Sequence, residues 1–76
     1  MKEFKMYNGE MLTVDEEIRF ADLWQSEDGD LDEILESGCC WIGNDEDDAP
    51  VNADFEIVSY CKEEPVKSLV KVTGIF

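Results

Sequence analysis

Carboxylates are the side chains in this sequence whose types and spacing come closest to a recognisable chemical site. In the run DGDLDE, Asp28, Asp30 and Asp32 have the spacing of the first three ligands of an EF-hand calcium loop. The later positions of that loop fail, because Glu33 occupies the place of its glycine and Cys39 the place of its bidentate glutamate. The run therefore argues against a specific calcium site.

A second acidic run, NDEDDAP, starts at Asn44 and fails the same comparison at Ala49 and Phe55. Weak, nonspecific divalent binding by its acids stays open. We expect instead a hydrated loop with loosely held counterions, because charge runs of this kind are normally solvated. The acids of this run are Asp45, Glu46, Asp47 and Asp48.

The three cysteines fit neither a metal site nor a nucleophile. A structural zinc needs four ligands, usually with paired CxxC spacing, and the chain has neither that spacing nor a histidine. Without histidine no side chain is suited to take a thiol proton, and negative surroundings raise the pKa of a thiol. On a strand, adjacent Cys39 and Cys40 would point to opposite faces, so we expect one of them in the core, and Cys61 to fill the core too. The sequence predicts no metal and no cofactor.

Catalysis by carboxylates is also disfavoured. General acid–base work needs a carboxyl group that is buried well enough to raise its pKa. Only Asp22, Asp54 and Glu56 lie in partly apolar runs, and the chain lacks a glycine-rich phosphate loop. We expect a binding protein and not an enzyme.

The charge distribution is the most unusual property of the chain. It has 20 Asp and Glu against 6 Lys and Arg, a net charge of −14. Sixteen of the acids lie between Asp15 and Glu56, where Arg19 is the only base. Their mutual repulsion opposes the compact state, so the excess asks for a functional reason. It also disfavours direct binding to nucleic acid or to a membrane, since both bind through Lys and Arg.

Length and composition predict a single domain over residues 1–76. Apolar residues make up 43% of the chain, which favours a packed core over disorder. No apolar run is long enough to cross a bilayer, and the first residues lack the apolar centre of a signal peptide. Together with an odd number of cysteines, these features predict a soluble, cytoplasmic protein.

The elements that must position the acids begin with a β-hairpin. The run FKMYNGEMLTV alternates apolar and other residues around Asn8 and Gly9. This pair suits the two positive φ angles of a type I′ turn. We therefore expect strands at about residues 2–7 and 10–13.

A helix is predicted next, over residues 14–25. Apolar residues recur there at helical intervals, and the residues Thr13 and Glu16 have capping-box spacing. Alternation of apolar residues within the same stretch leaves a strand open as the alternative. The helix would place Asp15 and Asp22 on an acidic face, together with Glu16.

The rest of the chain predicts a second helix followed by antiparallel strands. Asp30 and Gly38 have the positions of caps around a short helix at residues 31–37. The runs CCWIG, DFEIVSYC and SLVKVTGIF read as strands, the last two as a hairpin, and Pro50 excludes a central strand from continuing through the acidic loop. The fold class is α+β, one small domain with an N-terminal hairpin, one or two short helices and C-terminal antiparallel strands.

The candidate partner-binding surface combines the acids of both runs with two tryptophans. Carboxylates three or four apart on a helix lie ~5–6 Å apart, so helices and loop together could match the charge density of a phosphate backbone. Each tryptophan is expected first in the core and second as a hydrophobic anchor at the interface. The surface consists of Glu27, Asp28, Asp30, Asp32, Glu33, Glu36, Asp45, Glu46, Asp47, Asp48, Trp24 and Trp41.

With its acidic runs DEEIRFADLWQSEDGDLDEILE and NDEDDAP in a very short α+β chain, the sequence resembles small acidic inhibitor proteins of phages and mobile elements. These are the DNA-mimic anti-restriction and anti-CRISPR proteins. The resemblance is one of type, because such proteins share no diagnostic motif. It implies inhibition of a nuclease, restriction enzyme or CRISPR effector in the host cytoplasm, by occlusion of a basic surface.

An alternative function remains open at this point. The chain could be an acidic adaptor or immunity-type protein that binds one protein through aromatic and aliphatic contacts. Its charge would then serve solubility and the rate of association. Both hypotheses predict a protein partner, and pairing through an edge strand leaves a homodimer open.

Overall fold

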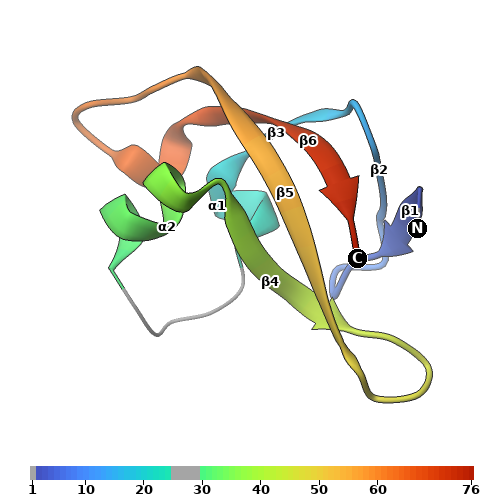
Figure 1. The fold of residues 1–76 in the computed structure, drawn as a ribbon. Helices are drawn as coiled ribbons and strands as arrows, with labels where there is room; N and C mark the ends of the chain where they lie inside the picture. Colours follow the sequence, from blue (N-terminus) through green and yellow to red (C-terminus); the bar gives the residue numbers. More distant parts are fainter. Residues whose placement is uncertain (1, 25–29) are drawn as a thin grey trace.

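The computed structural model describes residues 2–24 and 30–76, and it confirms the α+β class. A two-stranded sheet of β1 (Glu3–Lys5) and β2 (Met11–Thr13) lies beside a four-stranded antiparallel sheet in the order β3-β6-β5-β4 (Figure 1). Two short helices precede β4, and a 3₁₀ turn at Pro65–Lys67 precedes the last strand. Among the described residues, no helix is long and apolar enough to cross a membrane.

The N-terminal hairpin is confirmed, with shorter strands and a different turn. Met6 and Glu10 close a three-residue loop through a 2.8 Å hydrogen bond from the Met6 N–H to the Glu10 carbonyl. Gly9 has a φ of 85°, and no positive φ occurs at Asn8. The type I′ prediction is therefore wrong. The loop is a three-residue turn that ends in a left-handed glycine, another common way to join two antiparallel strands.

The helix predicted over residues 14–25 is wrong, and most of the stretch is not helical. Residues 14–16 form a turn, with Asp15 in the left-handed conformation at a φ of 75°. β3 (Glu17–Arg19) follows, and α1 (Phe20–Leu23) is a single turn. The acidic helix face expected from Asp15 to Asp22 therefore does not exist.

Long-range pairing explains this outcome. The Asp15 N–H donates to the Val72 carbonyl at 2.7 Å, and the Val72 N–H donates to the Glu16 carbonyl at 2.9 Å. β3 continues this pairing along β6 (Leu69–Ile75). These bonds use backbone groups that a helix would have needed for itself, so the strand alternative describes residues 17–19 correctly.

The second helix is confirmed as α2 (Leu31–Ser37) with both caps. The Asp30 side chain accepts a hydrogen bond from the Asp32 N–H at 3.0 Å, and left-handed Gly38 donates to the Ile34 carbonyl at 3.2 Å. A Cβ at Gly38 would lie 3.0 Å from the Phe55 carbonyl oxygen. Glycine is therefore required where α2 turns into the sheet.

The C-terminal strands form as predicted, but one begins earlier. β4 (Cys39–Asn44) pairs with β5 (Pro50–Ser59), and β5 pairs with β6. The sequence predicts that this strand starts at Asp54, whereas its first residue is Pro50. Proline is tolerated at the first position of a strand, where its missing N–H need not donate a hydrogen bond to the sheet. Figure 1 shows β4 and β5 as a long twisted ribbon with α2 at one end and the acidic loop at the other.

The core lies between the four-stranded sheet, α1 and the N-terminal hairpin. Alternate residues of β5 are buried, and Val70 and Val72 of β6 are fully buried on the same face, as their spacing predicts. At the centre, the Phe20 ring lies 5.4 Å from the Phe55 ring and 5.8 Å from the Trp24 ring. This aromatic group fixes α1 against the sheet.

Candidate partner-binding surface

The acidic loop is a second copy of the N-terminal turn geometry. The Asp45 N–H donates to the Ala49 carbonyl at 2.9 Å, and the Asp48 N–H donates to the Asp45 carbonyl at 3.0 Å. Asp48 has a φ of 60° and takes the place that Gly9 has in the first hairpin. The Asp45 carboxylate also accepts from the N–H groups of Asp47 and Ala49, at 2.9 and 3.0 Å. The loop therefore holds its acids in a defined turn.

Asn44 connects this loop to one of the predicted tryptophans. The Trp41 indole N–H donates to the Asn44 side-chain oxygen at 3.2 Å, and the Asn44 amide donates to the Asp48 carboxylate at 3.0 Å. Trp41 is 39% exposed. Its first expected location, the core, is wrong, because it lies on the outer face of β4, between the inward-facing Cys40 and Ile42. The structure thus brings Trp41 and Asp48 into one hydrogen-bonded group.

Trp24 has a different environment. Its ring is half-buried, packs against the core and stacks on Phe20 at an interplanar angle of 13°. The buried indole N–H has no hydrogen-bond partner within the described part of the chain. The core expectation fits Trp24, and the structure does not bring it beside Trp41.

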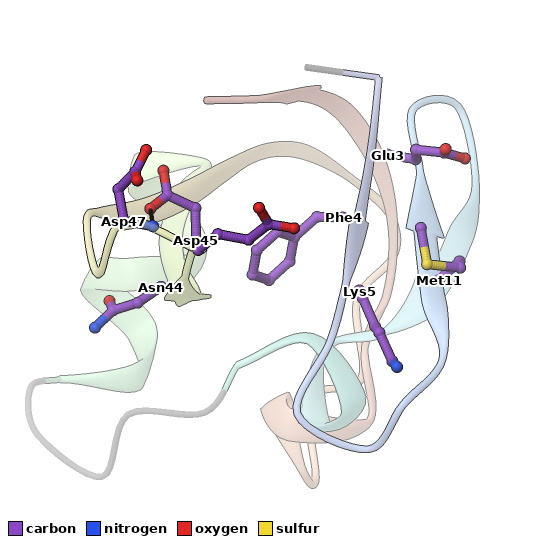
Figure 2. A pocket seen from close by; sticks show the side chains of 8 residues that line it. Glu3, Phe4, Lys5, Met11, Asn44, Asp45 and Asp47 are labelled. Atoms are coloured by element: carbon purple, nitrogen blue, oxygen red, sulfur yellow. Dashed lines mark hydrogen bonds between the residues drawn. The ribbon is translucent and has the colours of Figure 1, made fainter.

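An open hollow lies between the two hairpins, next to the acidic loop. We call it the hairpin hollow, and it encloses about 520 Å³. Phe4 and Met11 supply its apolar surface, and Asp45, Glu46 and Asp47 contribute carboxylates (Figure 2). The remaining lining residues are Glu3, Lys5 and Asn44.

The position of Phe4 follows from a bend in β4. The pairing of β4 with β5 shifts register between Trp41 and Gly43, and Gly43 has a φ of 144°. A Cβ at Gly43 would lie 3.2 Å from two carbons of the Phe4 ring. Glycine therefore lets the ring pack on the β4 backbone and form the floor of the hollow. Figure 2 shows the Lys5 side chain pointing away from Asp45 and Asp47, so the cation does not cover the floor.

The second acidic group lies on α2. Its described members, which we call the α2 acids, are Asp30, Asp32, Glu33 and Glu36, and all four are exposed. Leu35 of the same helix is buried in the core, with an exposed fraction of 3%. Glu27 and Asp28, which were expected to extend this group, lie outside the described residues. An amphipathic single helix thus turns its acids outward.

The α2 acids and the loop acids, Asp45, Glu46, Asp47 and Asp48, occupy opposite ends of β4 (Figure 1). At ~3.3 Å per strand residue, β4 separates the two groups by roughly 20 Å. They are two acidic clusters and not the continuous charged sheet that helices at 14–25 and 31–37 would have formed.

Among the described residues, neither cluster forms an ion pair with a basic side chain. The ion pairs among the described residues join Lys67 to Glu64 at 3.2 Å and Lys71 to Asp15 at 3.9 Å. Within the same residues, no Lys or Arg nitrogen lies within 4.0 Å of a carboxylate of the loop acids or the α2 acids. The negative charge of both clusters is therefore open to a partner.

The surroundings of the two adjacent cysteines keep their thiols protonated. Cys40 is buried, and burial, followed by the neighbouring Cys39, raises the pKa of its thiol to about 12. The pKa of Cys39 is raised by burial first, and then by its hydrogen bond to the Asp54 carboxylate and by the charge of that group. One of the two adjacent thiols lies in the core, as expected. Cys61, also expected there, is half-buried. Within the described chain, no three His, Cys, Asp or Glu residues are arranged to hold a metal ion.

Sequence reasoning missed Phe4 and Met11 beside the loop acids and Ile57 beside the α2 acids, whereas the aromatic Tyr60 is a candidate interface anchor from its residue type alone. A groove of about 300 Å³, the α2 groove, is lined by Asp32, Leu35, Glu36, Ile57 and Tyr60. The sequence signal is the apolar run at Ile57, Val58 and Tyr60, which places apolar side chains on both faces of a strand end; the structure leaves all three exposed.

Comparison with protein-family models, with curated proteins and with solved structures gives no match to this chain.

Proposed function

We propose that this chain is a non-enzymatic inhibitor that occludes the basic surface of a nucleic-acid-binding enzyme or complex by DNA mimicry. The partner is a nuclease, restriction enzyme or CRISPR effector whose Lys and Arg side chains normally hold phosphates. Carboxylates of the loop acids and the α2 acids take the place of those phosphates. Such association is steered by charge and weakens steeply as salt is added.

The observation that carries the proposal is the open charge of the two clusters. All members of both clusters except Asp45 are exposed, and none has a Lys or Arg partner within 4.0 Å in the described chain. A protein that used acids only to stay dispersed needs a smaller excess, since a net charge of magnitude ~2–8 suffices for a small domain. The acids of each cluster repel one another and so destabilise the folded protein, and a basic partner would relieve this repulsion.

The hairpin hollow adds a contact for individual basic side chains. An arginine that enters it stacks on the exposed side of the Phe4 ring and meets Asp45 or Asp47 with its guanidinium group. Arginine suits such a site because its planar group pairs with carboxylates and also lies flat on aromatic rings. The exposed Trp41 supports the same interface from the outer face of β4.

The test begins with capture of partners from host lysate by the immobilised protein. The bound proteins are identified at low and at high NaCl, and duplex DNA is then added as a competitor. Mimicry predicts that the partners are DNA-binding proteins, that salt releases them and that duplex DNA displaces the inhibitor. Partners that resist salt and ignore DNA would contradict mimicry.

Charge variants locate the interface on the chain. The variant Asp45→Asn, Glu46→Gln, Asp47→Asn, Asp48→Asn should weaken binding and lower the salt dependence of the affinity. A matched control neutralises four exposed acids outside both clusters, namely Glu10, Glu17, Glu56 and Glu63. Equal effects of the two variants would show that total charge, and not the loop, drives binding.

A second function, an adaptor or immunity-type protein, is favoured by one observation. Trp41 and Phe76 are 39% and 62% exposed, and Asn52 pairs with Trp41 on one side and bonds to the Phe76 backbone on the other. The two exposed aromatic residues therefore mark an apolar surface on the outer face of the sheet where a partner would bind. An adaptor bound there would be little affected by salt and indifferent to duplex DNA.

A further inference from the structure

The α2 groove has an apolar surface that the core leaves uncovered. Ile57 and Tyr60 line it with exposed fractions of 42% and 53%, and Leu35 of α2 closes its base. Ile57 pairs with the buried Val70 and so belongs to the inner face of the sheet. The pairing of β5 with β6 shifts register just after Ile57. The inward-facing Ile57 next to this shift is exposed to solvent.

The charge around the groove selects the partner. Asp32 and Glu36, one helical turn apart, form the rim on the α2 side. Arg19 and Lys67 line a neighbouring hollow on the other side of Tyr60, where Arg19 donates to the Lys67 carbonyl at 3.0 Å. Lys67 is also paired with Glu64. An apolar floor with an acidic rim complements an apolar side chain that has basic neighbours.

We propose that the α2 groove binds an apolar side chain, such as leucine, from a partner segment that carries lysine or arginine on either side of it. Leucine would contact Leu35, Ile57 and Tyr60, while the flanking cations meet Asp32 and Glu36. The inference rests on the basic partner of the proposed function. It adds a contact that salt does not weaken, because burial of apolar surface is insensitive to ionic screening.

The test uses two short peptides of equal length and charge, KKLLKK and KKGGKK, as probes of the full chain. The leucine peptide is expected to bind about tenfold more tightly, the gain from partly burying leucine side chains. This advantage should persist at ~0.5 M NaCl, where screening reduces the binding of both peptides. Amide chemical shifts should change at Leu35, Glu36, Ile57 and Tyr60 with the leucine peptide.

The variant Ile57→Ser should remove most of the leucine advantage and leave the affinity for KKGGKK unchanged. Val58→Ser is the matched control, because Val58 is 50% exposed on the same strand and does not line the groove. Loss of the advantage only in Ile57→Ser supports the groove. Tyr60→Ser should act like Ile57→Ser, which guards against a folding defect in one variant.

The outcomes separate this inference from the function on which it rests. Equal affinity for the two peptides, or an equal loss in Ile57→Ser and Val58→Ser, overturns the groove and leaves the charge-based function standing. Failure of both peptides to bind at low salt overturns both proposals. A leucine advantage with chemical-shift changes around Trp41 and Phe76 instead would move the apolar contact to the outer face and overturn the groove.

Discussion

Replacing Asp48 by asparagine should stabilise the protein, and the gain should depend on salt. Asp48 is held at a φ of 60° among three other acids, and its carboxylate accepts a hydrogen bond from Asn44. Asparagine keeps an oxygen acceptor and is among the residues that tolerate the left-handed region best. The substitution therefore removes one charge and little else.

The magnitude follows from the spacing of the loop acids. Carboxylates ~7 Å apart in water repel by ~0.6 kcal/mol per pair, so three such neighbours contribute ~1.8 kcal/mol without screening and ~1.5 kcal/mol after the weak screening at ~10 mM salt. Roughly half of this cancels, because the same acids are neighbours in the unfolded chain. The remaining gain of ~0.7 kcal/mol corresponds to a rise in Tm of about 3–5 °C for a domain of this size.

The assay is thermal unfolding followed by circular dichroism, at ~10 mM and at ~0.5 M NaCl. Most of the gain should disappear at the higher salt. The control Glu10→Gln removes an exposed acid next to Gly9, in the hairpin that lacks an acidic cluster, and should change Tm less. The prediction would be refuted if Asp48→Asn did not raise Tm at low salt, or raised it equally at both salt concentrations. Repulsion between the loop acids would then not destabilise the folded state.

Three further predictions concern the whole fold. Gly38→Ala should destabilise the protein by ~2 kcal/mol or more, because its Cβ would lie 3.0 Å from the Phe55 carbonyl oxygen. Gly9→Ala, with no atom within 4 Å of the added Cβ, should cost only ~1 kcal/mol. Urea unfolding of both variants measures the difference, and equal losses of stability would contradict the steric argument. The free energy of unfolding should fall as the pH rises above 9.0, because the Cys40 thiol, with its pKa raised to about 12, keeps its proton in the folded state while the unfolded chain loses it. By pH 10 the protein should have lost ~1 kcal/mol of stability by this route. Cys40→Ala should abolish that part of the pH dependence. Raising NaCl from ~10 mM to ~0.5 M should raise the Tm of the unmodified protein, and a Tm that fell or stayed constant would show that repulsion is not a net cost to the folded state.

Local patterns predicted those elements that local interactions determine. The α2 helix forms between Asp30 and Gly38 because both caps act within a few residues of the helix. The 14–25 stretch shows the opposite case. Thr13 and Glu16 do form the hydrogen bond of a capping box, from the Thr13 N–H to the Glu16 carboxylate at 3.1 Å. No long helix follows, since backbone groups of residues 15 and 16 bond to Val72, which is remote in sequence.

The candidate site was predictable in its charge and not in its shape. Asp32 and Asp47 can be identified from the sequence alone, because each lies in a run of acidic residues. The apolar floors beside them come from other segments. Phe4 reaches the acidic loop only because Gly43 admits its ring, and Tyr60 reaches α2 only because β5 runs past the helix. The apolar periodicity of a single segment does not indicate such contacts between segments that are remote in sequence.

β5 has a consequence for the size of any target. It is the longest strand, Pro50–Ser59, and it begins at the acidic loop and reaches the α2 groove at Ile57. At ~3.3 Å per residue, the seven residues from Pro50 to Ile57 place the two sites up to roughly 23 Å apart, and pairing with β4 and β6 on the two edges holds β5 in that position. A molecule that touches both must be at least that wide. Short ligands would therefore occupy one place at a time, while a folded domain engaging both would gain the avidity of two tethered contacts.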